Sequence, residues 1–221
     1  MKAIIMAAGK TGVDSADDSY GGFPTNCKPK CLLKMERNGK PILERNVKLL
    51  RKHGIEDIIV VVGYQASLIT EFVKKRKLNL KLVYNPNYAS AGATQSLLLA
   101  LDQVEDNEEA IIMILGDVLI NNAIVTKLIE ADSDICVTVN ISNAAELYLA
   151  KFTKNSLGDL HEMEKWIMSM GVHERGKFLA FCQHLKNLGA KEVQPSKPHV
   201  NLIREIDEWF RVARFNREEE K

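Results

Sequence analysis

The sequence contains no long hydrophobic run and no large excess of charge of one sign. No apolar stretch approaches the ~20 residues that a membrane-spanning helix requires, and nothing at the N-terminus resembles a signal peptide. Thirty basic residues stand against 29 acidic ones, which leaves a net charge of +1. A nearly neutral chain has no overall field that would attract nucleic acid or an anionic membrane. We therefore expect a cytoplasmic protein whose partners are small molecules, with no nucleic acid and no membrane among them.

Cysteine is scarce, and neither cysteine nor histidine shows the spacing of a metal site. The four cysteines are Cys27, Cys31, Cys136 and Cys182, and they lack the paired spacing of zinc motifs. Buried, reduced thiols are the common state of such cysteines in a cytosolic protein. Because Cys27 and Cys31 flank Lys30, a reactive thiol in this segment is the alternative interpretation.

An apolar run at the N-terminus leads into a glycine and a polar loop. Residues 3–8 read Ala-Ile-Ile-Met-Ala-Ala, which predicts a strand buried on both faces in the middle of a sheet. Gly9 lets a ligand approach the backbone closely, and Lys10 and Lys30 bring cations to both ends of the loop. A phosphate-rich ligand would suit these cations, and an ordinary solvated loop is the alternative. A Walker A loop is excluded, because Ile4 stands where that motif needs a glycine.

Strands and helices alternate along most of the chain. Apolar residues at helical spacing predict helices over residues 41–53 and through 68–73, 97–101 and 124–129. Strands are predicted at residues 58–62, 80–84, 110–115 and 135–139. This order predicts an α/β fold with a mostly parallel sheet and helices on its faces. The sheet is expected to be complete or nearly so by residue 140, with residues 147–152 adding a further strand.

Two polar segments follow predicted strands, where ligands bind in open parallel sheets. Asp117 comes directly after strand 110–115, and a carboxylate there suits Mg²⁺, which is held by one or two carboxylates plus substrate phosphates. A turn-starting aspartate is the alternative. The small residues of segment 89–96 would let a flat base approach. A helix N-cap by Thr94 or Ser96 is the other interpretation of that segment, and both can hold together.

These motifs resemble the opening of the nucleotidyltransferases that activate phosphorylated small molecules. The matching residues are Ala7-Ala8-Gly9, Pro29-Lys30-Cys31-Leu32-Leu33 and Gly39-Lys40-Pro41. Within the sugar-phosphate nucleotidyltransferase superfamily, the sequence is most similar to cytidylyltransferases for phosphocholine-like alcohols and for methylerythritol phosphate. The similarity covers residues 1–121. It implies a Rossmann-like three-layer sandwich of the nucleotide-diphospho-sugar transferase type.

The resemblance also implies an activity and roles for individual residues. The activity is Mg²⁺-dependent transfer of CMP from CTP to a phosphorylated or phosphonate small molecule, with release of pyrophosphate. Asp117 and Asp207 would hold the Mg²⁺, and Lys30 would act at the α-phosphate. An N-cap of the last helix is the alternative role for Asp207. The residues implied in nucleotide binding are Ala7, Ala8, Gly9, Lys10, Ala91, Gly92, Ala93, Thr94 and Ser96.

We expect one nucleotidyltransferase domain over residues 1–221, a length that suits a single domain. Residues 1–140 would form the nucleotide-binding core, 141–204 an acceptor-side subregion, and 205–221 a closing helix and tail. In the family the later half often provides an assembly surface, so a homodimer is compatible with the resemblance.

Three rival functions stay open. A sugar-1-phosphate nucleotidyltransferase would use another nucleoside triphosphate. A non-catalytic nucleotide-binding regulator is favoured by the loop after Gly9, which lacks the family's arginine and is acidic over residues 14–18. A sugar-nucleotide glycosyltransferase is disfavoured, because Val118 and Leu119 exclude the Asp-x-Asp pair of many such enzymes.

Overall fold

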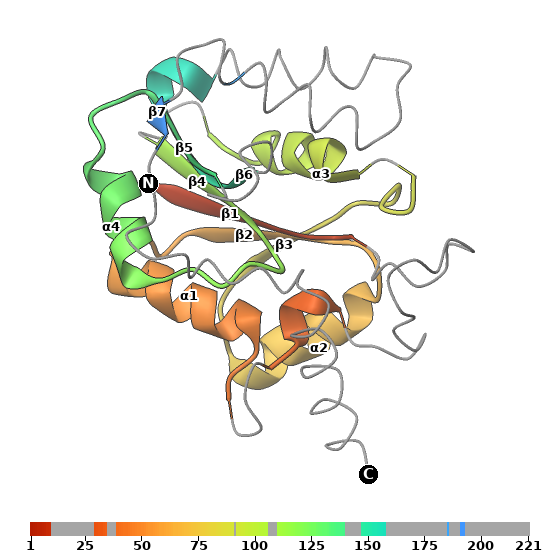
Figure 1. Ribbon diagram of the computed structural model, residues 1–221. Helices are drawn as coiled ribbons and strands as arrows, with labels where there is room; N and C mark the ends of the chain where they lie inside the picture. Colours follow the sequence, from red (N-terminus) through yellow and green to blue (C-terminus); the bar gives the residue numbers. More distant parts are fainter. Residues whose placement is uncertain are drawn as a thin grey trace, which may run out of the picture.

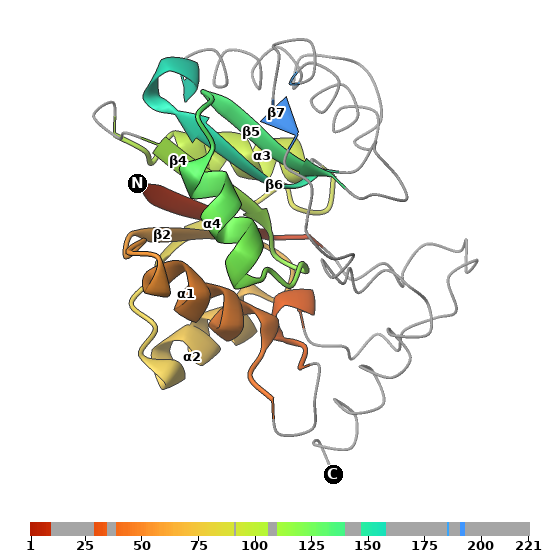
Figure 2. The same ribbon diagram turned by 60° about the vertical axis from the view of Figure 1, so that its left-hand side comes forward.

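A sheet flanked by helices forms the centre of the protein (Figures 1 and 2). The computed structural model describes residues 1–9, 29–34, 39–90, 92–105, 110–139, 147–157, 185 and 191–192. The strands are β1 (Lys2–Ala7), β2 (Ile58–Val62), β3 (Lys81–Tyr84), β4 (Ala110–Leu115), β5 (Ile135–Val139), β6 (Leu147–Thr153) and β7 (Lys191–Glu192). The helices are α1 (Ile42–Lys52), α2 (Ala66–Arg76), α3 (Gly92–Leu101) and α4 (Asn122–Glu130), with a short 3₁₀ helix, η1 (Lys30–Leu32).

The sheet has the strand order β3-β2-β1-β4-β6-β5-β7. β1 pairs in parallel with β2 and β4, β2 with β3, and β5 with β7, whereas β6 runs antiparallel to both β4 and β5. The predicted mostly parallel sheet is confirmed. However, β6 lies between β4 and β5, so the sheet is not complete at residue 140. The further strand expected at residues 147–152 is present as β6, but the chain returns after β5 to place it between β4 and β5.

Helices cover both faces of the sheet, which gives the three layers that the resemblance implied. Figures 1 and 2 show α1 and α2 on one face and α3 on the other. α4 lies beside α1, where the ring nitrogen Nε2 of His53 is 3.1 Å from Oδ1 of Asn122. Asn121 caps α4, since its side chain accepts a hydrogen bond from the Ile124 amide at 3.0 Å.

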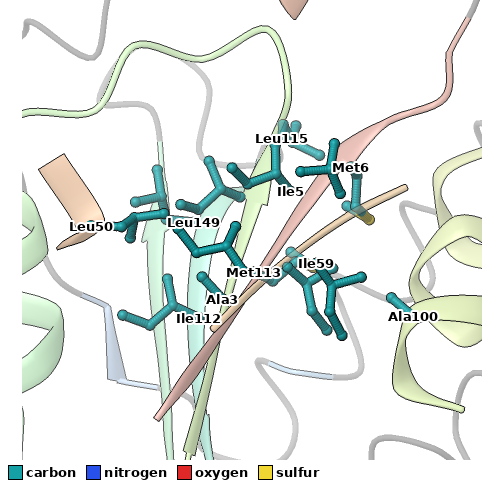
Figure 3. Packing of buried hydrophobic residues seen from close by; sticks show 14 of the residues in the cluster. Ala3, Ile5, Met6, Leu50, Ile59, Ala100, Ile112, Met113, Leu115 and Leu149 are labelled. Atoms are coloured by element: carbon teal, nitrogen blue, oxygen red, sulfur yellow. The ribbon is translucent and has the colours of Figure 1, made fainter. Parts of the chain in front are cut away.

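The core lies around β1, β2 and β4 (Figure 3). Every residue of β2 and β4 is buried, and so are all residues of β1 except Ala7. Such uninterrupted apolar runs are typical of parallel strands with helices on both faces. β3 forms one edge of the sheet, and its side chains are half-buried or exposed. Among the described residues, no helix is long and apolar enough to cross a membrane.

Two helices begin at points that matter for the site. α1 starts directly after Pro41 and buries Leu43, Val47 and Leu50, the apolar stripe predicted from the sequence. α3 was predicted from Leu97 onward, but it starts at Gly92. Thr94 and Ser96 therefore lie inside the helix, and neither is its N-cap. Packing of α3 over β1 and β2 outweighs the weak helix propensity of its small and polar first residues.

Candidate functional site

Lys30 and Asp117 meet beyond the carboxyl end of β4, although 87 residues separate them in the sequence. The Nζ atom of Lys30 lies 3.3 Å from Oδ2 of Asp117. The Lys30 side chain is 31% exposed and that of Asp117 is 15% exposed, so both charged groups still reach solvent. Lys30 opens η1, and Asp117 follows the carboxyl end of β4. The two residues to which the sequence analysis assigned catalytic and metal-binding roles are thus brought together.

The backbone around Asp117 is held tightly. The Gly116 amide donates to the Met6 carbonyl at 2.8 Å, and the Val118 amide donates to the Leu115 carbonyl at 3.2 Å. A Cβ atom at position 116 would lie 2.7 Å from the Met6 carbonyl oxygen, which real Cβ atoms do not tolerate. Gly116 is therefore needed for the close approach of β4 to the end of β1. This turn fixes the point from which the Asp117 carboxylate projects.

Cys31 lies next to Lys30 but is poorly suited to reaction. It is a free, buried thiol, and burial together with the negative charge of Asp117 raises its pKa to about 12. Because the thiolate is the nucleophile, a thiol with such a pKa is inert near neutral pH. The interpretation of Cys31 as a reactive residue is wrong. Cys136 is also free and buried, which confirms reduced thiols at both positions, while Cys27 and Cys182 lie outside the described residues.

The predicted nucleotide-binding residues of the first strand lie at its carboxyl end. Ala7 is the last residue of β1, and Ala8 accepts a hydrogen bond at its carbonyl from the Tyr64 amide at 2.9 Å. A Cβ atom added to Gly9 would meet no atom of the described residues within 4 Å. Gly63 differs from Gly9 in this respect, because a Cβ atom there would collide with Tyr88.

Residues 92–96 of the segment predicted to contact the base form the first turns of α3. Thr94 and Ser96 are both buried. The Ser96 hydroxyl accepts a hydrogen bond from the side-chain amide of Asn85 at 3.0 Å, which ties α3 to the end of β3. In the described part of the chain, the buried Oγ1 of Thr94 and the buried Oε1 of Gln95 have no hydrogen-bond partner. Because a buried polar atom without a partner is costly, these two atoms are candidates for contact with a ligand.

Some predicted site residues lie outside the described residues, namely Lys10, Ala91 and Asp207. Within the described ranges no group of three or more His, Cys, Asp or Glu residues could hold a metal ion. One carboxylate such as Asp117 is nevertheless sufficient for Mg²⁺ when substrate phosphates supply further oxygen ligands. The roles assigned to these residues stay predictions.

Asn46 is a residue of this site that sequence reasoning missed. It lies on the buried face of α1, and its side chain bonds the segment that follows Asp117. The available signal was a polar residue within the apolar stripe of an amphipathic helix, next to Val47. A buried asparagine at such a position needs hydrogen-bond partners, and its partners here are 72 and 74 residues away in the sequence.

Comparison with known proteins places the chain in a family. The sequence model of a domain of unknown function, DUF6564, matches residues 26–168. The chain belongs to the DUF6564 family. The matched range of this DUF6564 chain includes Lys30, α3 and Asp117.

Relatives of the DUF6564 chain are named nucleotidyltransferases. Choline-phosphate cytidylyltransferase of Streptococcus pneumoniae is 34% identical over 107 residues, which are 48% of this chain and 42% of that protein. Mannose-1-phosphate guanylyltransferase catalytic subunit beta of Dictyostelium discoideum is 28% identical over 94 residues, 40% of this chain and 26% of that protein. The DUF6564 chain thus spans less than half the length of these curated relatives. The predicted resemblance to nucleotidyltransferases is confirmed.

A solved structure extends the likeness of fold to the whole chain. A nucleotidyl transferase from Methanothermobacter thermautotroptrophicus superimposes with a TM-score of 0.66 and covers 98% of both chains. The sequences are 21% identical, so this likeness shows the fold alone. The Rossmann-like nucleotidyltransferase fold predicted from the sequence is confirmed.

Proposed function

We propose that this DUF6564 protein transfers CMP from CTP to a phosphorylated or phosphonate small molecule and releases pyrophosphate. The observation that carries the proposal is the pairing of Lys30 with Asp117 at the carboxyl edge of β4, 3.3 Å apart and partly exposed to solvent. A cation and a carboxylate at this edge are the groups that a triphosphate and its metal ion need. The names of the sequence relatives support the same reaction class.

In the proposed reaction an oxygen of the acceptor's phosphate or phosphonate attacks the α-phosphorus of CTP. A new bond forms between that oxygen and the α-phosphorus. The bond from the α-phosphorus to the oxygen that bridges to the β-phosphate breaks, and its electron pair leaves with pyrophosphate. No covalent intermediate with the protein is needed. Much of the barrier comes from bringing two polyanions together in line, so fixed positive charge and positioning supply most of the catalysis.

Lys30 would supply that positive charge at the α-phosphate. Its ammonium group lies near Asp117, beyond the carboxyl end of β4. The Lys30 side chain is partly exposed, so a phosphate oxygen can reach it. A preorganised cation stabilises the negative charge that develops on the α-phosphate oxygens as the nucleophile approaches.

Asp117 would hold Mg²⁺, together with Asp207 from outside the described residues. The fit rests on donor chemistry, because Mg²⁺ prefers carboxylate oxygens and Asp117 presents one at the end of a buried strand. When bound, the ion supplies further positive charge to the substrate phosphates. Asp117 thus orients the triphosphate relative to Lys30.

The preference for cytosine rests on the first turns of α3. Selection of one base requires buried polar groups that match its edge, since apolar contacts separate substrates only weakly. The buried Oγ1 of Thr94, which has no partner among the described residues, is such a group. The small residues Gly92 and Ala93 would let a flat ring approach the helix. Another nucleoside triphosphate with a sugar 1-phosphate is the second candidate, because one sequence relative is named a mannose-1-phosphate guanylyltransferase.

A pyrophosphate-release screen tests the proposal. It crosses CTP, UTP, GTP and dTTP with phosphocholine, phosphonates, polyol phosphates and sugar 1-phosphates, each with Mg²⁺. The expected result is release that needs CTP and one acceptor class and that is lost in Asp117→Asn. Release with GTP and a sugar 1-phosphate would replace CTP by the second candidate. Binding of a triphosphate without release in any combination would favour the regulator.

Three further expectations stay predictions. The first is that residues 141–204 form the acceptor side, and the second is a homodimer, which light scattering of the purified chain would test. The third is action in the cytoplasm, where nucleoside triphosphates are available. Localisation of a tagged full-length protein would test it.

A further inference from the structure

The side chain of Asn46 joins α1 to the segment that follows Asp117. Its Nδ2 donates to the Val118 carbonyl at 2.7 Å, and its Oδ1 accepts from the Ile120 amide at 3.4 Å. Asn46 is 1% exposed, and Val118 and Ile120 are also buried. Water therefore cannot replace these bonds without opening the core. Of the uncharged side chains of this length, an amide both donates and accepts, as the two backbone groups require.

The same helix is bonded to the segment that carries Lys30. The Ile42 amide, in the first turn of α1, donates to the Leu33 carbonyl at 3.1 Å, directly after η1. Lys34 and Pro41 form an isolated antiparallel bridge next to this bond. Because Ile42 and Asn46 are one helical turn apart, the first two turns of α1 contact both segments of the candidate site.

We propose that Asn46 is a positioning residue that sets the place of Asp117 relative to Lys30, with α1 acting as the brace between the two segments. This inference rests on the proposed function, in which Asp117 binds the metal ion and Lys30 binds the phosphate. The hydrogen bonds of Asn46 go to the backbone of Val118 and Ile120, and not to the side chains of Lys30 and Asp117. It acts through the backbone of residues 118–120, next to the Asp117 carboxylate.

Loss of the Asn46 amide leaves two buried backbone groups without partners. The segment would then move to find other partners or water, and the Asp117 carboxylate would move with it. Replacing a residue that orients a metal ligand without binding the metal itself typically weakens metal affinity by about 10- to 100-fold. We expect an effect of this size on the site, in addition to a loss of stability.

The experiment compares Asn46→Leu and Asn46→Ser with a matched control, Thr138→Val. Thr138 is also buried, and its hydroxyl likewise donates to one backbone carbonyl and accepts from one backbone amide, both of Leu149. These bonds join β5 to β6 and involve none of residues 116–121, although Leu149 also pairs with Ile114 of β4. Asn46→Ser is smaller than the native residue and serves where the leucine variant fails to fold.

Three readouts are taken on the full-length protein: amide hydrogen exchange over residues 116–121, Mn²⁺ binding followed by electron paramagnetic resonance, and the kcat and KM of pyrophosphate release. The Asn46 variants should exchange the Ile120 amide at least ~10-fold faster than wild type. They should bind Mn²⁺ about 10- to 100-fold more weakly and lose kcat more than they raise KM. Thr138→Val should lose stability while keeping wild-type exchange at Ile120 and wild-type Mn²⁺ affinity.

Unchanged exchange at Ile120 in folded Asn46→Ser would overturn the proposal. Faster exchange with unchanged Mn²⁺ affinity would also overturn it, because Asp117 would then not depend on the brace. Equal loss of Mn²⁺ binding in Thr138→Val would show a general effect of destabilisation and would contradict a positioning role. If wild type binds no Mn²⁺ and releases no pyrophosphate, the proposed function fails, and the exchange at Ile120 alone decides whether the brace exists.

Discussion

The ammonium group of Lys30 and the carboxylate of Asp117 form an ion pair in which neither group is fully removed from solvent. Ion pairs near the surface contribute about 0–1 kcal/mol to stability, since water and salt screen them. Substrate phosphates and a metal ion can therefore separate the two groups at little cost. The account predicts that removing either charge changes activity far more than it changes folding.

Asp117→Asn should keep the fold and lower turnover by ~10²-fold or more, because a pre-placed ion is worth several kcal/mol of charge stabilisation. The measurement is pyrophosphate release beside a thermal melt followed by circular dichroism. A stable variant with wild-type turnover would remove Asp117 from the site.

Lys30→Met keeps the length of the side chain but removes its charge. Loss of a preorganised donor costs ~3 kcal/mol, which corresponds to a fall in kcat of about 10²-fold. Mn²⁺ binding without nucleotide should become tighter, since the ammonium group no longer competes for Asp117. Lys75→Met, which removes an exposed charge on α2, is the control and should change neither value. Near-normal turnover of Lys30→Met would contradict its role at the α-phosphate.

Cys31 should make stability depend on pH in the alkaline range. Burial raises the pKa of its thiol from 9.0 to about 12 in the folded protein. Between these two values the unfolded chain loses the thiol proton and the folded chain keeps it, so stability falls as pH rises, by up to about 1.4 kcal/mol per pH unit. Urea titrations at pH 9 to 11 should show a shallower loss for Cys31→Ala. Equal pH dependence in wild type and variant would rule out this burial effect.

Thr94→Val removes the buried hydroxyl that has no partner among the described residues. Stability should stay the same or rise by about 1 kcal/mol, since an unsatisfied polar group is lost. CTP binding, measured by calorimetry with Mg²⁺, should weaken if that hydroxyl contacts the base. Ser96→Ala is the contrasting variant, because it breaks the bond from Asn85 and should lower stability. A Thr94→Val variant that is destabilised but binds CTP normally would show that Thr94 has a structural role and does not contact the base.

The sequence was sufficient for the elements that local patterns determine. Continuous apolar runs predicted the central strands, and the stripe of Leu43, Val47 and Leu50 predicted α1. The place of Asp117 also followed from the rule that open parallel sheets bind ligands beyond the carboxyl ends of their strands. Each of these inferences uses neighbours in the chain or a general property of the fold.

The features that sequence reasoning missed depend on contacts between distant segments. Nothing local in residues 147–153 indicates that β6 lies between β4 and β5, because strand order is decided by pairing across the sheet. The early start of α3 at Gly92 is a tertiary effect, since glycine costs a helix about 1 kcal/mol relative to alanine. The partners of Asn46 come after β4 and could not be identified before the fold was known.

Phosphorus-31 NMR of the full-length protein with CTP, Mg²⁺ and the acceptor class found in the screen tests the central claim most directly. The account predicts that the α-phosphorus of CTP moves into a new diphosphate with the acceptor, while pyrophosphate appears in an equal amount. Asp117→Asn and Lys30→Met should slow both signals together. Release of inorganic phosphate from CTP without a new diphosphate, or no reaction with any acceptor, would contradict nucleotidyl transfer at this site.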